Sequence, residues 1–345
     1  MNIKSLLLGS AAALVAVSGA RAADAVVIAE PEPVEYVRVC DAYGAGYFYI
    51  PGTETCLAIG GMIRYDIGAN SEADGWMKNL RTELKVTAKS ETELGTLGAY
   101  IRLRSDTQSG FKLPYVDGNE GRFGNDSGMF VQDAIISLGG LELGLSDTLF
   151  DDELPNFENE FTGADRIHFM RYTFTGGNGF SATLALEEAD YDYDYVPNIV
   201  GKVGVAQGWG SANFYAAYDA SREEFALKGV ATVAVTNAVE LGLIATYESD
   251  YSFYSLDNGL DDFGGYEWSA GASAKFKATD KLAFTVGGQY FGANHFNDGD
   301  DYTVGVVVDY NIVENFDTKL AVNYYDGDNY EDGEVGGFLR FERNF

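Results

Sequence analysis

Apolar and polar side chains alternate along most of the chain, in segments of roughly 9–13 residues that start near residue 57. In one such segment the apolar phase holds Leu97, Ala99 and Ile101, whereas Arg102 and Arg104 lie on the opposite phase. A side-chain period of two is typical of a β-strand with one apolar and one polar face. The pattern therefore predicts an all-β protein.

Sixteen segments show this alternation, and the connections between them differ in length in a regular way. The segments begin near Leu57, Leu80, Thr96, Met129, Leu141, Arg166, Phe180, Ile199, Ala212, Phe225, Val239, Tyr266, Leu282, Tyr302, Phe316 and Val335. Short connections, such as residues 237–238, alternate with long ones, such as residues 108–127, and only residues 221–224 break the rule. Short turns at one end and long loops at the other are typical of an antiparallel β-barrel in an outer membrane.

A soluble β-sandwich shows the same alternation, and the positions of the aromatic residues distinguish the two folds. On the apolar phase, the long-loop end carries Tyr65, Tyr218, Phe225, Tyr247, Trp268, Tyr290, Tyr302 and Tyr324. The short-turn end carries Phe174, Phe180, Phe276, Phe284, Tyr310, Phe316 and Phe345. Two aromatic belts that flank an aliphatic band match the two interfaces of a lipid bilayer. We therefore predict a sixteen-stranded antiparallel transmembrane β-barrel.

The composition narrows the possible functions. The 345 residues include 53 acidic and 23 basic ones, which gives a formal net charge of −30. Nucleic acid is not an expected partner, because binding to phosphates requires a basic surface. The chain has 2 His and 2 Cys, which offer little material for a zinc or iron–sulfur site. No metal or cofactor is therefore predicted.

Residues 1–22 have the features of a secretory signal peptide. Lys4 precedes a short apolar stretch, and residues 20–22 form a cleavage site of the A-x-A type. The apolar stretch is shorter than the about 20 residues that a membrane-spanning helix needs. Export brings Cys40 and Cys56 into an oxidising compartment. The mature chain is then expected either in the periplasm or, as a barrel, in the outer membrane.

The segment at residues 39–61, VCDAYGAGYFYIPGTETCLAIGG, and the four residues after it resemble the start of the general porins of alphaproteobacteria. The resemblance implies a trimer of sixteen-stranded barrels, each with its own pore, which an inward-folded third long loop narrows. In this chain the third long loop is the connection at residues 149–165. Candidate trimer contacts lie on the fourth to sixth segments, and the fourth segment is apolar on both faces.

The resemblance also implies an organisation of the chain. Residues 1–22 are the signal peptide, residues 23–56 a periplasmic N-terminal segment, and residues 57–345 the transmembrane barrel. Cys40 and Cys56 then lie just before the first strand. In an exported protein we favour a disulfide between them over two unpaired thiols, and closing such a loop would stabilise the fold by about 3 kcal/mol.

A barrel of sixteen strands is wide enough for a water-filled channel, so the polar residues of its inner phase are the candidate functional residues. The basic ones concentrate in the early segments and are Arg64, Arg81, Lys85, Arg102, Arg104 and Arg171. The acidic ones concentrate on the third long loop and are Asp151, Asp152, Glu153, Glu158, Glu160 and Asp165. We hypothesise that they form opposed walls of a constriction in a passive diffusion channel for small hydrophilic solutes and ions, with a weak preference for cations.

Much of the negative charge lies on other long loops, for example residues 298–301 and 326–332. These loops are expected either to contact lipopolysaccharide through divalent cations or to be solvated. Residues 298–301 lack the spacing of an EF-hand loop. The expected location is the outer membrane, with its lipid and lipopolysaccharide as partners.

Two alternative functions stay open at this point, and a third, an enzyme, is considered and not expected. A channel selective for a sugar or a dicarboxylate could use the inner-phase residues Tyr100, Tyr215 and Tyr325. A structural or adhesive barrel without a pore fits poorly, because inner-phase glycines such as Gly271 are too small to fill a wide lumen. An enzyme is not expected, because His168 on the outer phase has no serine in register and no G-x-S-x-G motif is present.

Overall fold

The chain divides into two units in the computed structural model, Met1–Arg38 and Val39–Phe345. The structure describes residues 38–71, 75–109, 128–158, 162–163, 166–188, 196–257 and 265–345. The expected signal peptide, Glu160 and Asp165 lie outside these ranges. Within the described residues no helix is long and apolar enough to cross a membrane. A 3-10 turn at Asp41–Tyr43 precedes the first strand.

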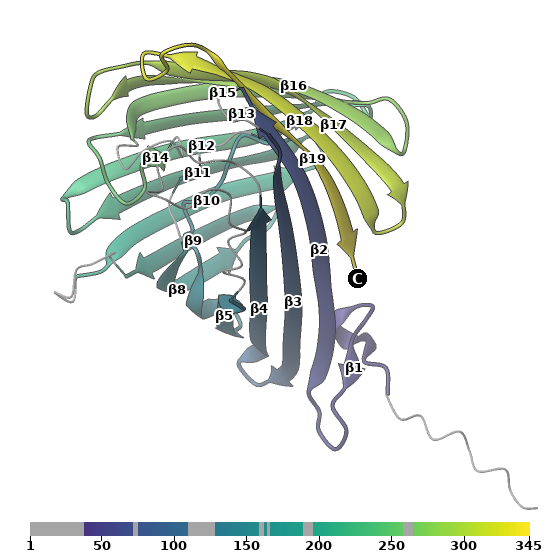
Figure 1. The fold of residues 1–345 in the computed structure, drawn as a ribbon. Helices are drawn as coiled ribbons and strands as arrows, with labels where there is room; N and C mark the ends of the chain where they lie inside the picture. Colours follow the sequence, from purple (N-terminus) through teal and green to yellow (C-terminus); the bar gives the residue numbers. More distant parts are fainter. Residues whose placement is uncertain are drawn as a thin grey trace, which may run out of the picture. The chain divides into compact units, whose positions relative to one another are not determined.

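Sixteen antiparallel strands form a closed barrel (Figure 1). They are β2 (Cys56–Asn70), β3 (Met77–Thr92), β4 (Gly95–Ser109), β5 (Phe130–Leu138), β6 (Leu141–Asp147), β8 (Arg166–Thr175), β9 (Phe180–Glu187), β10 (Asn198–Gln207), β11 (Gly210–Asp219), β12 (Glu224–Ala234), β13 (Val239–Glu248), β15 (Tyr266–Lys277), β16 (Leu282–Asn294), β17 (Asp301–Val313), β18 (Phe316–Gly327) and β19 (Glu334–Asn344). Each strand begins within three residues of the start that the alternation predicts. The predicted fold class is confirmed.

The ring closes where the last strand meets the first. β19 pairs with β2 from Gly336 opposite Asn70 to Asn344 opposite Met62. Two backbone hydrogen bonds between Gly61 and Phe345, of 2.9 and 3.1 Å, extend this pairing to the last residue. A Cβ atom at Gly61 would lie 2.5 Å from both the Glu83 carbonyl oxygen and the Phe345 ring, so only glycine fits. Among the sixteen described barrel strands, closure gives every strand a neighbour on both sides.

The apolar phase of the strands faces outward, as predicted, and it carries both aromatic belts. Neighbouring belt residues touch across the strands: the ring centres of Trp268 and Tyr290 are 5.4 Å apart at the long-loop end. At the short-turn end, the belt residue Phe316 stacks on Phe341 of the neighbouring strand, with the ring centres 6.5 Å apart. The outer surface therefore presents an aliphatic band between two aromatic girdles.

The fourth predicted segment departs from regular alternation because it contains a β-bulge. Arg102 pairs with Asp133 and Leu103 pairs with Val131, which leaves Gln132 without a partner on β4. Gln132 and Asp133 are both buried, although they are adjacent in the chain. A bulge shifts the side-chain phase by one residue, and this shift explains why the segment reads as apolar on both faces.

The N-terminal segment folds back along the beginning of β2. A short strand, β1 (Phe48–Tyr49), pairs with Cys56 and Leu57. Cys40 and Cys56 form the favoured disulfide, and both are buried. Tyr43 donates a hydrogen bond of 2.8 Å to Glu91 on β3. The disulfide and this hydrogen bond fix the segment to the short-turn end of the barrel.

Candidate functional site

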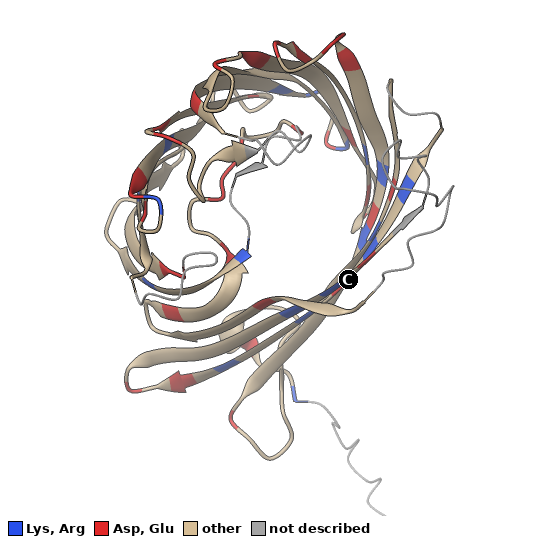
Figure 2. Ribbon diagram, turned by 60° about the vertical axis from the view of Figure 1, so that its left-hand side comes forward, with Lys and Arg blue, Asp and Glu red and all other residues tan. Residues whose placement is uncertain are grey.

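Residues 148–158, in the connection between β6 and β8, fold into the barrel and pack against its inner wall. Figure 2 shows segments of the chain inside the ring of strands. We call residues 148–158 the constriction loop. Its side chains Phe150, Leu154 and Phe157 are at most 5% exposed and pack against inner-phase residues such as Val200. Phe157 occupies space that a side chain at Gly287 would fill, since a Cβ there would lie 2.7 Å from the Phe157 ring. The inner-phase glycine thus makes room for the loop.

A buried lysine holds the backbone of the constriction loop. Lys228 on β12 is 1% exposed, and its Nζ donates hydrogen bonds to the carbonyl oxygens of Phe150 (2.7 Å) and Asp152 (3.0 Å). The same ammonium group lies 4.4 Å from the centre of the Phe150 ring. No carboxylate in the described ranges forms an ion pair with it. Carbonyl dipoles and an aromatic face therefore stabilise this buried charge.

Further polar contacts fix both ends of the constriction loop. Glu187 on β9 accepts hydrogen bonds from the Thr148 hydroxyl (2.6 Å) and the Leu149 amide (2.8 Å). The Tyr215 hydroxyl donates to Asp152. At the other end, the Asn323 amide donates to the Glu158 carbonyl oxygen. The loop is thus tied to strands from β9 to β18, which places it across much of the lumen.

A second loop, residues 249–257, also enters the lumen and packs on the constriction loop. Tyr254 is fully buried, with its ring centre 5.4 Å from that of Phe150, and its hydroxyl donates to Glu187. The backbone of β14 (Leu256–Asp257) pairs with that of β7 (Thr162–Gly163). Sequence analysis did not predict this second inward loop. The signal was present as aromatic residues at 251, 253 and 254 within a long, otherwise polar connection.

Three of the four predicted basic residues of β3 and β4 surround one buried carboxylate. Glu83 contacts Lys85 (3.3 Å), Arg102 (3.8 Å) and Arg104 (2.9 Å). Arg102 also pairs with Asp133 on β5. The Glu83 side chain is 2% exposed, whereas that of Lys85 is 38% exposed. The carboxylates therefore lie behind the cations, and the cations face the lumen.

The other predicted cations are also paired with acids of a neighbouring strand. Arg64 contacts Glu342 at 3.0 Å, and Arg171 contacts Glu142 at 2.7 Å. Arg81 forms two hydrogen bonds with Asp106. Sequence analysis missed these acidic partners because cross-strand pairing depends on register. All of them lie on the inner phase, so the alternation could have identified them as lumen residues.

The predicted acids of the constriction loop take different positions. Asp151 and Glu153 are exposed and line a cavity of about 510 Å³ between the loop and strands β11 and β12. Asp152 accepts the hydrogen bond from Tyr215. Glu158 forms ion pairs with Lys319 on β18 and Arg340 on β19, neither of which was predicted.

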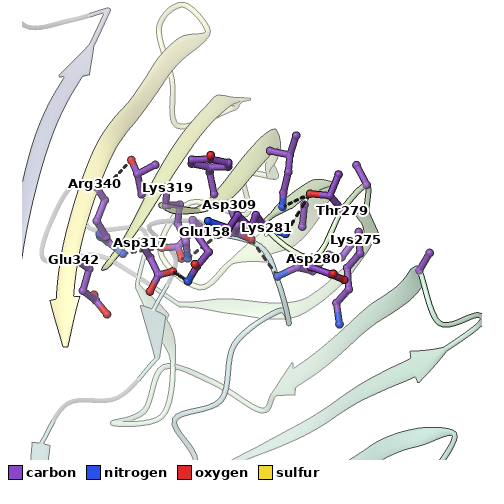
Figure 3. Close-up of a pocket in the computed structure, with 18 of the residues that line it drawn as sticks. Glu158, Lys275, Thr279, Asp280, Lys281, Asp309, Asp317, Lys319, Arg340 and Glu342 are labelled. Atoms are coloured by element: carbon purple, nitrogen blue, oxygen red, sulfur yellow. Dashed lines mark hydrogen bonds and ion pairs between the residues drawn. The ribbon is translucent and has the colours of Figure 1, made fainter. Parts of the chain in front are cut away.

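A cavity of about 820 Å³ lies in the lumen near the short-turn end (Figure 3). Its charged lining is drawn from β2, the constriction loop, β15, β17, β18, β19 and the turn before β16. The cations are Arg64, Lys275, Lys277, Lys281, Lys319 and Arg340, and the anions are Glu158, Asp280, Asp309, Asp317 and Glu342. A polar, charged cavity of this kind suits hydrated solutes rather than apolar ones.

Comparisons with known proteins agree with this architecture. A family model described as "Porin subfamily" matches residues 24–342. Porin Omp2a of Brucella suis biovar 1 is 41% identical over 379 residues, and porin Omp2b of Brucella abortus is 40% identical over 377 residues; each alignment covers both chains completely. The chain belongs to the porin family of alphaproteobacteria. This porin forms a channel for passive diffusion across the outer membrane, and family membership implies a channel rather than an enzyme.

Solved structures support the fold of this porin. The outer membrane channel DcaP of Acinetobacter baumannii aligns with a TM-score of 0.66 at 13% identity, over 86% of this chain and 99% of that one. An anion-selective porin from Comamonas acidovorans aligns with a TM-score of 0.61 at 14% identity, over 85% and 100%. OmpT of Vibrio cholerae, described in its trimer form, aligns with a TM-score of 0.60 at 11% identity, over 85% and 100%.

Because Lys228 holds the backbone of the constriction loop, replacing it should make this loop more mobile. Replacing Lys228 with Met removes the Nζ donor from two loop carbonyl oxygens, and an unsatisfied buried carbonyl oxygen, such as that of Phe150, costs about 1–3 kcal/mol. We expect higher conductance and more current noise in single-channel recordings of Lys228→Met. The control is Lys202→Met, which removes an inner-phase ammonium that lies over the Tyr215 ring. If both variants show the same conductance and noise, Lys228 does not position the loop.

The second inward loop predicts a pH effect through His295. Nε2 of His295 lies 3.6 Å from Glu248, and Nδ1 lies 3.6 Å from Asp250. The Glu248 carboxylate is the main cause that raises the pKa of His295 above its ordinary value. A raised pKa means that the stabilisation is complete below about pH 6.5, the unfolded value, and is lost as the pH rises through the folded value.

We therefore expect His295→Asn to lower the hydrogen-exchange protection of the amides at residues 251–256 more at pH 5.5 than at pH 9. The comparison is made with the wild-type porin at each pH, which removes the intrinsic pH dependence of exchange. A larger loss of protection at pH 9 would contradict the assigned interaction.

Proposed function

We propose that the constriction of this porin lies between the constriction loop and the wall of β2–β4. The main support is the layering of charge on that wall. Glu83 and Asp133 are 2% and 7% exposed, whereas Lys85 and Arg102 are 38% and 19% exposed. A solute in the lumen is therefore closer to the cations than to the acids that compensate them.

The opposite side of the proposed constriction is acidic. Asp151 and Glu153 are exposed on the constriction loop. Opposed cations and anions orient water and polar solutes across the channel, and apolar solutes must disrupt that ordered water. Small hydrophilic solutes and ions are therefore the proposed cargo, with weak charge selectivity.

A channel that guides one sugar along an aromatic path is less well supported. Tyr215 is 1% exposed and holds Asp152, and Tyr325 is 6% exposed and stacks on Tyr330. Buried rings offer no face to a passing solute. Of the three tyrosines considered, Tyr100 alone is not buried.

We also propose that the porin is a homotrimer that contacts its copies through the outer face of β5, β6 and β8. β6 has 7 residues, fewer than the about 9–11 that a strand needs to span the hydrocarbon core. In the described chain, Leu97, Ile136 and Leu141 stand on the outer phase at the short-turn ends of β4, β5 and β6, without an aromatic residue. β8 keeps Tyr172 and Phe174 exposed on its outer face, so the wall without an aromatic girdle is that of β4–β6. A short wall of this kind suits contact with protein better than contact with lipid.

We further propose how the full chain is processed and oriented in the outer membrane. Residues 1–22 are removed as a signal peptide, residues 23–56 lie in the periplasm, and the barrel follows. The acidic long loops at the other end face lipopolysaccharide. The disulfide and β1 hold the periplasmic segment at the short-turn end, which fits this orientation.

The charge layering predicts the effect of removing the most exposed wall cation. Lys85→Gln should make the channel more cation-selective, seen as a shift of the reversal potential toward that of K⁺ in a KCl gradient. The control is Lys89→Gln on the same strand, where the ammonium lies 5.6 Å from two tyrosine rings of the N-terminal segment. Position 89 is about 13 Å away along the strand, beyond a Debye length of about 8 Å. Equal shifts in both variants would contradict the proposed wall.

The trimer predicts the size distribution of conductance steps. When the wild-type porin inserts into a planar bilayer, current should rise in groups of three equal, ohmic steps. Leu141→Arg and Ile136→Arg on the proposed contact face should convert these groups into single steps. Single steps from the wild-type protein would contradict the trimer.

A further inference from the structure

The constriction loop places one carboxylate inside the cationic cavity. Glu158 pairs with the Lys319 ammonium, and its second oxygen lies 3.6 Å from Nη1 of Arg340. Figure 3 shows Glu158 close to these two side chains, which project from the neighbouring strands β18 and β19. The Asn323 amide holds the Glu158 backbone oxygen from the same wall. Two cations and one amide thus converge on the end of the described loop segment.

Both cations already have an acidic partner within the wall. Arg340 contacts Asp66 at 2.8 Å, and Lys319 lies 3.8 Å from Asp309. Glu158 is therefore an additional anion, which the loop brings to two cations that already have acidic partners on neighbouring strands. The wall can keep both cations in place when the loop carboxylate leaves.

The cavity around this contact is unusually cationic for such an acidic protein. The chain has 53 acidic and 23 basic residues, but six cations and five anions line this cavity. Without Glu158, the anions number four. The formal charge of the lining is therefore +1 with Glu158 and +2 without it, whereas the whole chain carries −30, so this part of the lumen is more favourable to small anions than the rest of the protein.

The contact is also open to solutes. The side chains of Lys319 and Glu158 are each 29% exposed, and the cavity of about 820 Å³ is large enough for a small organic acid and several waters. A guanidinium group beside an ammonium group is well matched to a carboxylate, because both can donate charge-assisted hydrogen bonds to its two oxygens.

We propose that Lys319 and Arg340 form a transit subsite for the carboxylate group of anionic solutes, and that Glu158 occupies this subsite when no solute is present. This inference rests on the proposed function, since the constriction loop must border the solute path. A solute carboxylate must displace an internal carboxylate, so its binding is weak. Weak binding suits a channel, because solute must leave as readily as it enters.

The test is the block of single-channel current by succinate at 0.1 M KCl, where the Debye length is about 10 Å. We expect Glu158→Gln to lower the half-blocking succinate concentration about tenfold, because the competing carboxylate is gone. Adding Lys319→Gln to this variant should restore a concentration at or above the wild-type value. The uncharged analogue succinamide should block none of these channels.

The matched control is Asp280→Asn, which removes one negative charge from the lining of the same cavity without touching Lys319 or Arg340. An equal increase in block by Asp280→Asn and Glu158→Gln would overturn the subsite, because it would show a general field effect. Equal block by succinamide would overturn it as well. A wild-type protein that does not conduct would instead refute the channel itself, so the two failures are distinguishable.

Discussion

Every backbone N–H and C=O group at membrane depth must find its partner within the protein, because the hydrocarbon core offers none. In this porin sixteen strands meet the requirement by forming a closed ring. The pairing of the last strand, β19, with the first, β2, completes that ring. Gly61 allows the Phe345 ring and the last backbone hydrogen bonds to lie against β2. The closed wall is apolar on its outer face and encloses a water-filled lumen. The arrangement of the lumen charges and of the inward loops depends on this division.

A wet interior changes the energetics of charge. On the lumen wall, arginines form ion pairs with acidic residues of neighbouring strands, such as Arg64 with Glu342 and Arg81 with Asp106. Pairs of this kind add little stability where water reaches them. Their effect is positional: each pair holds a guanidinium group at a given depth on the wall. A water-filled barrel needs this because no packed core fixes its inner side chains.

In the described part of the barrel interior, apolar side chains pack closely where the two inward loops meet the wall. Phe150 and Tyr254 form a small apolar cluster with inner-phase residues of β9–β13, and Lys228 is buried beneath it. A buried ammonium group without an ion pair in the described chain carries a desolvation penalty, and well-packed apolar residues at the same place would give a more favourable free energy of folding. Its hydrogen bonds to two loop carbonyls specify one loop position, which an apolar side chain does not do.

The sequence by itself determined the strands, their faces and the membrane interfaces, because a period of two and the placement of aromatic residues are local properties. It also identified Arg64, Arg102 and Glu158 as lumen residues. Only the tertiary structure decided which charges meet, since Arg64 and Glu342 are 278 residues apart and Lys319 and Glu158 are 161 apart. The second inward loop and the cationic cavity also arise only in the closed barrel, because strand register and loop packing bring distant segments to one depth of the lumen.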